Sequence, residues 1–161
     1  MANKEKITIK LNNLKFDAQN PRLPMRLQGV TDENKVIDYM VKYGNVTELM
    51  LSIGETGYSE AEPLLVVKEG TDKYIVVEGN RRLAALKLLN DSELTKVRIQ
   101  SINSVVSGAK YIPEEVPCIV YASREDVLDY LGYRHITGVK DWGALEKARY
   151  LDQLYQIHIK S

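Results

Sequence analysis

The chain has 161 residues, 44% of them hydrophobic and 27% charged, so it can bury a core and is not a disordered tail. Its 22 lysines and arginines are balanced by 22 acidic residues, which excludes attraction to DNA or an anionic membrane by net charge alone. A single cysteine, Cys118, excludes a disulfide framework and a multi-cysteine zinc site. Because the chain lacks an apolar run of about 20 residues and its first residues are rich in charge, we expect a cytoplasmic protein with no membrane partner.

The first part of the chain predicts one strand and two helices. Apolar and polar residues alternate over 7–11, which is the pattern of an edge strand. Apolar residues then recur at helical spacing over 36–41, in a helix that either Thr31 or Asp32 can cap. A second helix with the same spacing is expected over 46–53.

The middle of the chain predicts a β-hairpin followed by a helix. Two apolar runs, 63–67 and 74–77, are separated by a short polar segment with one glycine, and the second run leads into helix-forming residues at 83–89. Residues 92–113 have a weak pattern rich in serine and asparagine, so we expect a flexible insertion there. A further strand is expected over 116–121.

The last part of the chain predicts two helices, one from 124 to about 133 and one from Asp141 onward. The second helix is expected to bury an apolar stripe formed by Trp142, Leu145, Ala148, Leu151 and Leu154. The order of elements predicts an α+β fold in which helices flank a small mixed β-sheet. We expect residues 1–122 to form the core domain and 123–161 a helical extension, whose continuation past the chain is left open.

The four residues 79–82, Gly-Asn-Arg-Arg, carry the clearest chemical signal, because they lie between a strand and the first turn of a helix. Free backbone amides point outward at a helix N-terminus, and glycine lets a ligand approach them. The helix dipole disfavours arginine there by about 0.3–1 kcal/mol, so Arg81 and Arg82 indicate a bound anion such as phosphate. The alternative is an ordinary pair between Glu78 and Arg82, with Arg81 in solvent.

Residues 76–85, Val-Val-Glu-Gly-Asn-Arg-Arg-Leu-Ala-Ala, resemble the box of the ParB/sulfiredoxin superfamily, in which a glycine and a polar residue precede two arginines and an alanine-rich helix. The resemblance is to ParB N-terminal-like domains of the ParB-like nuclease type, and it covers roughly residues 5–150. Five further stretches agree with it: Asn-Pro-Arg at 20–22, the helix 46–53, the proline-led strand 63–67, the late strand 116–120 and the helix start 145–148.

In ParB-type proteins this box holds the triphosphate of CTP, and the proline-led strand lies against the nucleoside. The resemblance therefore implies a site for a nucleoside triphosphate, CTP or ATP, with Mg²⁺ left open. It implies phosphate contacts from Gly79, Asn80, Arg81 and Arg82, an additional phosphate ligand at Arg22, and nucleoside contacts from Glu62, Pro63 and Leu64. Arg134, where the chain departs from the family, is a further donor that would suit a phosphate. Two alternatives stay open: Arg22 pairs with a surface acid, and Pro63 and Leu64 only begin a strand.

The chain departs from the family on the later helix, where chromosome-segregation members have an acidic residue and an asparagine near the phosphates and metal. Arg134 and His135 occupy that stretch here, which leaves magnesium-dependent CTP hydrolysis and any metal ligands undetermined. His135 and Glu78 are the candidates for acid–base catalysis, although a lone histidine is more often structural. Sulfiredoxin-type chemistry is not expected, because Asn80 stands in the region where it needs a cysteine.

Three functions stay open from the sequence. The resemblance favours a nucleotide-binding domain of a DNA-associated protein, in which the ligand repositions the helices from Arg124 onward. DNA contacts would then come from other regions or from a partner, and a homodimer is left open. The second function is a nuclease that cleaves a DNA phosphodiester with His135 or Glu78. The third is a non-catalytic module in which Arg81 and Arg82 recognise an acidic protein.

Overall fold

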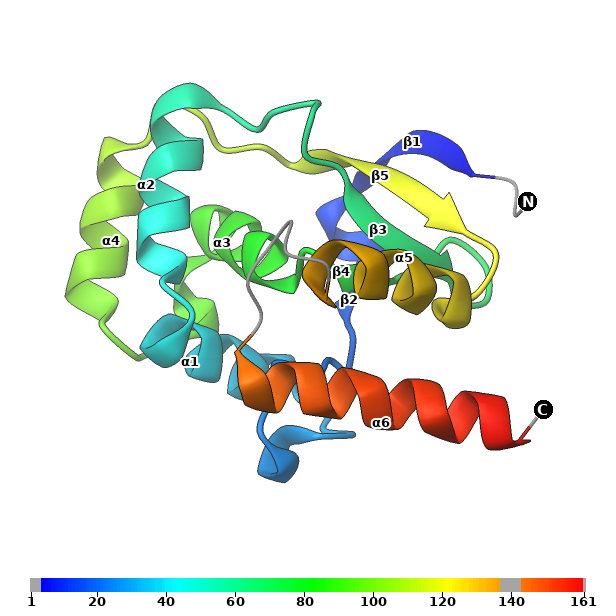
Figure 1. Cartoon of the computed structure of the whole chain (residues 1–161). Helices are drawn as coiled ribbons and strands as arrows, with labels where there is room; N and C mark the ends of the chain where they lie inside the picture. Colours follow the sequence, from blue (N-terminus) through cyan, green and yellow to red (C-terminus); the bar gives the residue numbers. More distant parts are fainter. Residues whose placement is uncertain (1–3, 137–142, 161) are drawn as a thin grey trace.

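The computed structural model describes the backbone of residues 4–136 and 143–160, together with their side chains except those of 133–136, 158 and 160. Five strands form one mixed sheet in the order β1-β5-β3-β4-β2 (Figure 1). The strands are β1 (Glu5–Lys10), β2 (Leu14–Phe16), β3 (Leu64–Lys68), β4 (Tyr74–Glu78) and β5 (Glu115–Tyr121). Neighbours pair antiparallel in β1–β5 and β3–β4 and parallel in β5–β3 and β4–β2. The predicted mixed sheet is confirmed, with β1 at its edge.

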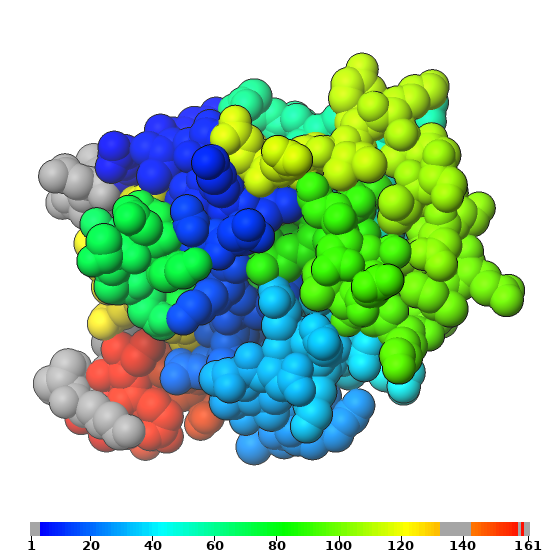
Figure 2. Space-filling model, turned by 180° about the vertical axis from the view of Figure 1, so that it is seen from behind, coloured from blue at the N-terminus to red at the C-terminus, as the bar shows by residue number. Residues whose placement is uncertain are grey.

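Helices cover both faces of this sheet, which confirms the predicted α+β fold. Within the described part of the chain they are α1 (Glu33–Tyr43), α2 (Val46–Thr56), α3 (Asn80–Asn90), α4 (Ile99–Gly108), α5 (Arg124–Ile136) and α6 (Ala144–Lys160). In Figure 1, α5 crosses in front of the sheet, α1–α4 gather to one side of it, and α6 runs below. Seen from behind, α4 forms one end of the molecule and α6 lies at the opposite lower corner (Figure 2).

The central strand β3 contributes to two separate cores. Leu64 and Val66 lie in the larger core, which also contains the buried residues of α1–α4. Leu65 and its partly buried neighbour Val67 lie in a smaller core with the inner faces of α5 and α6. Successive side chains of a strand point to opposite faces of the sheet, so a strand buried on both faces is a continuous apolar run. This is why the sequence shows no alternation at β3.

The prediction of a flexible insertion over 92–113 is wrong, because much of this segment forms α4. Ile102 is fully buried in the larger core, and Val105 and Val106 pack against it from partly buried positions. These apolar residues recur at helical spacing, but the serines and an asparagine between them weaken the pattern in the sequence. Packing against the rest of the core stabilises a helix that its own composition favours only weakly.

The apolar stripe expected on the last helix is confirmed at Leu154 and wrong at Leu145 and Leu151. The side chains of α6 that face the smaller core belong to Tyr150, Leu154 and Ile157, whereas Leu145 and Leu151 are 63% and 54% exposed. The helix carries apolar residues on two sides, so its period alone does not tell which side is buried. Asp141 and Trp142, which were expected to begin this helix, lie outside the described residues.

Candidate functional site

The strand β4 passes into the helix α3 through a single residue, Gly79, which adopts a left-handed conformation with φ of +104°. A Cβ atom at this position would overlap the Cδ2 atom of Leu64 and lie 3.1 Å from Nη2 of Arg82. Only glycine therefore fits here without strain or displacement of its neighbours. The amide of Leu83 bonds to the Gly79 carbonyl at 2.8 Å, so the amides before it lie in the first turn, where no helical acceptor exists.

The side chain of Asn80 anchors the start of α3. It is 4% exposed; its Nδ2 donates to the Val76 carbonyl at 2.8 Å, and its Oδ1 accepts from the Asp17 amide at 3.2 Å. These bonds join the start of α3 to β4 and to the segment after β2. Both polar atoms of the Asn80 side chain thus have a partner within the protein, and a phosphate contact from Asn80 stays a prediction.

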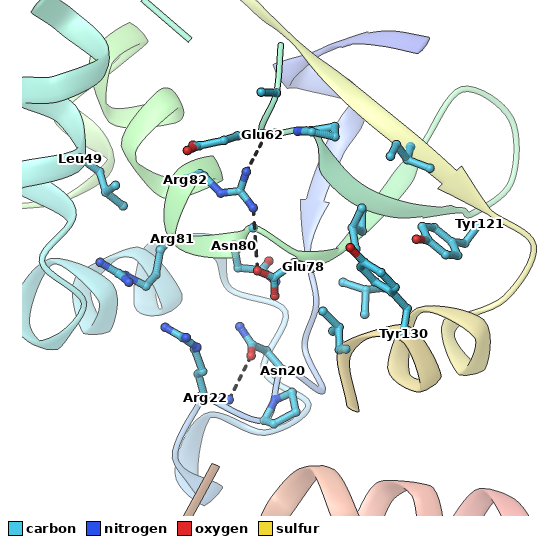
Figure 3. A pocket seen from close by; sticks show the side chains of 18 residues that line it. Asn20, Arg22, Leu49, Glu62, Glu78, Asn80, Arg81, Arg82, Tyr121 and Tyr130 are labelled. Carbon is cyan, nitrogen blue, oxygen red and sulfur yellow. Dashed lines mark hydrogen bonds and ion pairs between the residues drawn. The ribbon is translucent and has the colours of Figure 1, made fainter. Parts of the chain in front are cut away.

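Arg81 and Arg22 lie at the same end of a cavity, although 59 positions separate them in the chain (Figure 3). Nε of Arg81 donates to the Gly44 carbonyl at 2.5 Å, and Nε of Arg22 lies 3.4 Å from Oε2 of Glu146 on α6. Burial, and then the positive charges of Arg22 and Arg82, lower the pKa of Arg81. An anion between these guanidinium groups would offset that repulsion, because an opposite charge favours the charged form of arginine.

Arg82 points away from Arg81, toward the segment that precedes β3 (Figure 3). Its Nη1 donates to the carbonyl oxygen of Glu62 at 2.6 Å and to the hydroxyl of Tyr58 at 2.9 Å. Its Nη2 lies 3.8 Å from Oε1 of Glu78. The ordinary pair between Glu78 and Arg82 that the sequence left open is therefore present, and the Arg82 side chain is held by the protein's own atoms.

The cavity between these groups has a volume of about 800 Å³ and differs in character between its two ends (Figure 3). Asn20, Arg22 and Arg81 lie toward one end. The other is lined by apolar and tyrosine side chains: Leu65, Ile119, Tyr121, Tyr130 and Leu131. Glu62 and Pro63 lie along the wall that joins them. A cavity of this size and polarity suits a ligand with an anionic group and a flat, weakly polar group.

The sequence placed one neighbour of this cavity incorrectly and missed others. Leu64, expected to line the nucleoside side, is fully buried in the larger core, and Leu65 lines the cavity instead. Neighbouring residues of β3 face opposite sides of the sheet, so one of Leu64 and Leu65 must face the cavity. The sequence does not tell which of the two it is. Tyr121 and Tyr130 come from β5 and α5, and no local pattern in the sequence links these elements to the Gly-Asn-Arg-Arg box.

Of the two predicted catalytic residues, the structure describes the side chain of Glu78 but not that of His135. Arg134 and His135 belong to α5, but their side chains are outside the described set, so their roles stay predictions. Glu78 lines the cavity and pairs with Arg82. Over the described residues, no group of three or more histidine, cysteine, aspartate or glutamate side chains is placed to hold a metal ion. Cys118 is buried, and burial raises the pKa of its thiol to about 12.

Comparison with known proteins assigns the family. The model of the ParB N-terminal domain matches residues 2–116, and the chain therefore belongs to this family. The fold is also similar to a crystal structure of the C-terminally truncated chromosome-partitioning protein ParB from Caulobacter crescentus complexed with CTP-gamma-S. That match has 18% sequence identity, a TM-score of 0.48 and covers 89% of this chain. The match covers 59% of that truncated chain.

No curated protein is similar to the chain. Among the helices of the described residues, none combines the length and the apolar character that a membrane span requires.

Proposed function

We propose that the chain binds a nucleoside triphosphate, CTP or ATP, in the cavity beside Gly79, as a ParB-like domain of a DNA-associated protein. The observation that carries this proposal is the joint position of Arg22, Arg81 and the N-terminus of α3 at one end of a cavity whose other end is apolar. Guanidinium forks and free helix amides both favour phosphate oxygens. In this proposal, DNA contacts would come from other regions or from a partner. The proposal also includes assembly as a homodimer.

In this arrangement the ligand lies along the cavity with its phosphates at the arginine end. Arg81 and Arg22 would bind phosphate oxygens through their side chains, and the first amides of α3 would donate from the main chain. The nucleoside would lie toward Pro63 and Leu65, since a base and ribose need a weakly polar surface. The positive charge at one end fixes the direction of the ligand.

The proposal predicts that nucleotides stabilise the native chain and that Arg81→Ala removes most of this effect. A ligand at about 100 times its dissociation constant adds roughly 2.7 kcal/mol, which is about 5–10 °C in melting temperature for a chain of this size. We expect Arg81→Ala to weaken binding at least about tenfold, because a charge-assisted contact is lost. Thermal melting with CTP, ATP, GTP and inorganic tripolyphosphate checks this.

Arg26→Ala is a suitable control, because Arg26 is an exposed arginine that does not line the cavity. It should leave every ligand-induced shift unchanged. A native chain whose melting temperature responds to none of these compounds, or responds equally with and without Arg81, would contradict the proposal.

The contacts of α6 support a second part of the proposal, in which the ligand repositions this helix. The loop that presents Arg22 is also the place where α6 attaches. Nη1 of Arg149 donates to the Pro21 carbonyl at 3.0 Å, and Nε2 of Gln153 donates to the Gln19 carbonyl at 2.8 Å. Glu146 on the same helix pairs with Arg22. A phosphate that recruits Arg22 competes with Glu146, so ligand binding and the position of α6 would be coupled.

This coupling predicts that Glu146→Gln tightens triphosphate binding by about twofold to fivefold, because a partly exposed ion pair contributes at most about 1 kcal/mol. Isothermal titration calorimetry measures the affinity, and hydrogen exchange of α6 should increase in the variant. Asp152→Asn is the matched control, since Asp152 is an exposed acid on the same helix, away from the cavity. An equal effect of both substitutions would remove Glu146 from the mechanism.

A further inference from the structure

The wall of the cavity that precedes β3 has no regular secondary structure, and a small set of side chains holds it in place. Residues 58–63 run from the end of α2 to the start of β3, and Ala61, Glu62 and Pro63 line the cavity. Within the segment, a turn brings the Glu62 amide to 3.2 Å from the Ser59 carbonyl. A single turn leaves the orientation of the wall relative to α3 undefined, so contacts from outside it must set that orientation.

From outside the segment, Lys6 of β1 donates to the Glu60 carbonyl at 3.0 Å, and Arg82 forms a closed triangle of hydrogen bonds with Tyr58, the first residue of the segment, and Glu62. The Tyr58 hydroxyl donates to the Glu62 carbonyl at 2.6 Å, and Nη1 of Arg82 donates both to that carbonyl and to the hydroxyl. The Arg82 side chain is only 14% exposed, and Glu78 adds an ion pair to it from β4. Burial raises the pKa of Tyr58, so its hydroxyl keeps the proton that it donates to the wall.

We propose that Tyr58 and Arg82 are positioning residues, which hold the wall 61–63 against the nucleoside, and that the Arg82 side chain is not a phosphate ligand. This inference rests on the proposed nucleotide binding. The hydrogen bonds and the ion pair of the Arg82 guanidinium end on a phenol, a main-chain carbonyl and a carboxylate, and the group is directed away from Arg81 and Arg22 (Figure 3). The two arginines of the box thus have different tasks, phosphate binding for Arg81 and wall placement for Arg82.

The test separates the nucleoside from the phosphates by comparing CTP and ATP with inorganic tripolyphosphate. Tyr58→Phe removes the hydroxyl corner of the triangle and the two hydrogen bonds that meet there, while the ring stays in place. We expect the bound nucleotide to lose about threefold to tenfold in affinity, which corresponds to one hydrogen bond, while tripolyphosphate affinity changes less than about twofold. Isothermal titration calorimetry gives both dissociation constants for each variant. The readout is the dissociation constant of the nucleotide divided by that of tripolyphosphate.

Arg82→Lys is the second variant, because it keeps the positive charge and loses the fork that reaches Tyr58 and Glu62 together. It should raise the same ratio as Tyr58→Phe. Tyr111→Phe is the matched control: Tyr111 is 52% exposed, and its ring lies beside Gly57, one residue before Tyr58, without lining the cavity. It should leave both dissociation constants unchanged.

An equal loss of nucleotide and tripolyphosphate in Arg82→Lys would make Arg82 a phosphate ligand and overturn the inference. An unchanged ratio in Tyr58→Phe would overturn it as well, while leaving the proposed nucleotide binding intact. A native chain that binds no nucleotide would overturn both. A merely structural role of Tyr58 would lower stability and affect both ligands alike, so the ratio distinguishes placement of the wall from general loosening.

Discussion

Asn80→Ala should lower the free energy of unfolding by about 2–4 kcal/mol, because the substitution removes two buried hydrogen bonds that join the start of α3 to β4 and to the segment after β2. The Val76 carbonyl loses the Nδ2 donor, and the Asp17 amide loses the Oδ1 acceptor. Both bonds are buried. Each unsatisfied buried group costs about 1–3 kcal/mol. Equilibrium unfolding in urea, followed by circular dichroism, measures the difference.

Asn103→Ala is the matched control, since Asn103 is an exposed asparagine in the middle of α4. Alanine favours a helix more than asparagine does, so this variant should be neutral or slightly more stable. If Asn80→Ala costs no more than Asn103→Ala but abolishes nucleotide binding, then Asn80 acts on the ligand directly and its anchoring role is refuted.

Asn80 also shows where sequence reasoning reaches its limit. The sequence correctly predicted that β4 ends at a glycine and that a helix begins after it, because these features depend on neighbouring residues. The partner of Asn80 is Asp17, 63 positions earlier, which comes near only because β2 and β4 pair in parallel, with Phe16 opposite Val76. Polarity and spacing do not reveal such a partner. A buried anchor and a phosphate ligand therefore look alike in the sequence.

The helices were predictable to the degree that their signals are local. Asp32, one of the two proposed caps, caps α1 by accepting from the Asn34 amide at 3.0 Å. The hairpin formed by β3 and β4 also followed from its turn and flanking apolar runs. The errors at α4 and α6 have a different origin, because in both cases long-range packing decides what is buried. Propensity and period describe a helix by itself, and the side that it buries depends on its neighbours.

The second large effect concerns the contact between α5 and α6, where Gly132→Ala should cost about 1–3 kcal/mol. A Cβ atom at Gly132 would overlap the Tyr150 hydroxyl and lie 2.6 Å and 2.9 Å from its ring atoms Cζ and Cε1. Tyr150 is 1% exposed, and its hydroxyl donates to the Leu128 carbonyl, so the ring has no free space to move into. We expect α6 to separate partly from α5, which limited proteolysis and urea unfolding would both detect.

Two further variants test whether this cost comes from the contact with Tyr150. Gly108→Ala is the matched control, because a Cβ atom at Gly108 meets nothing within 4 Å, and it should change stability by less than about 0.5 kcal/mol. Tyr150→Leu removes the atoms that meet the new methyl group, so Gly132→Ala should cost at least about 1 kcal/mol less in that background. Additive costs would show that the helix tolerates alanine poorly for some other reason. A positive coupling would instead show that the fit of Tyr150 against Gly132 contributes to holding α6 on α5, beside the bonds that Arg149 and Gln153 make to the segment before Arg22.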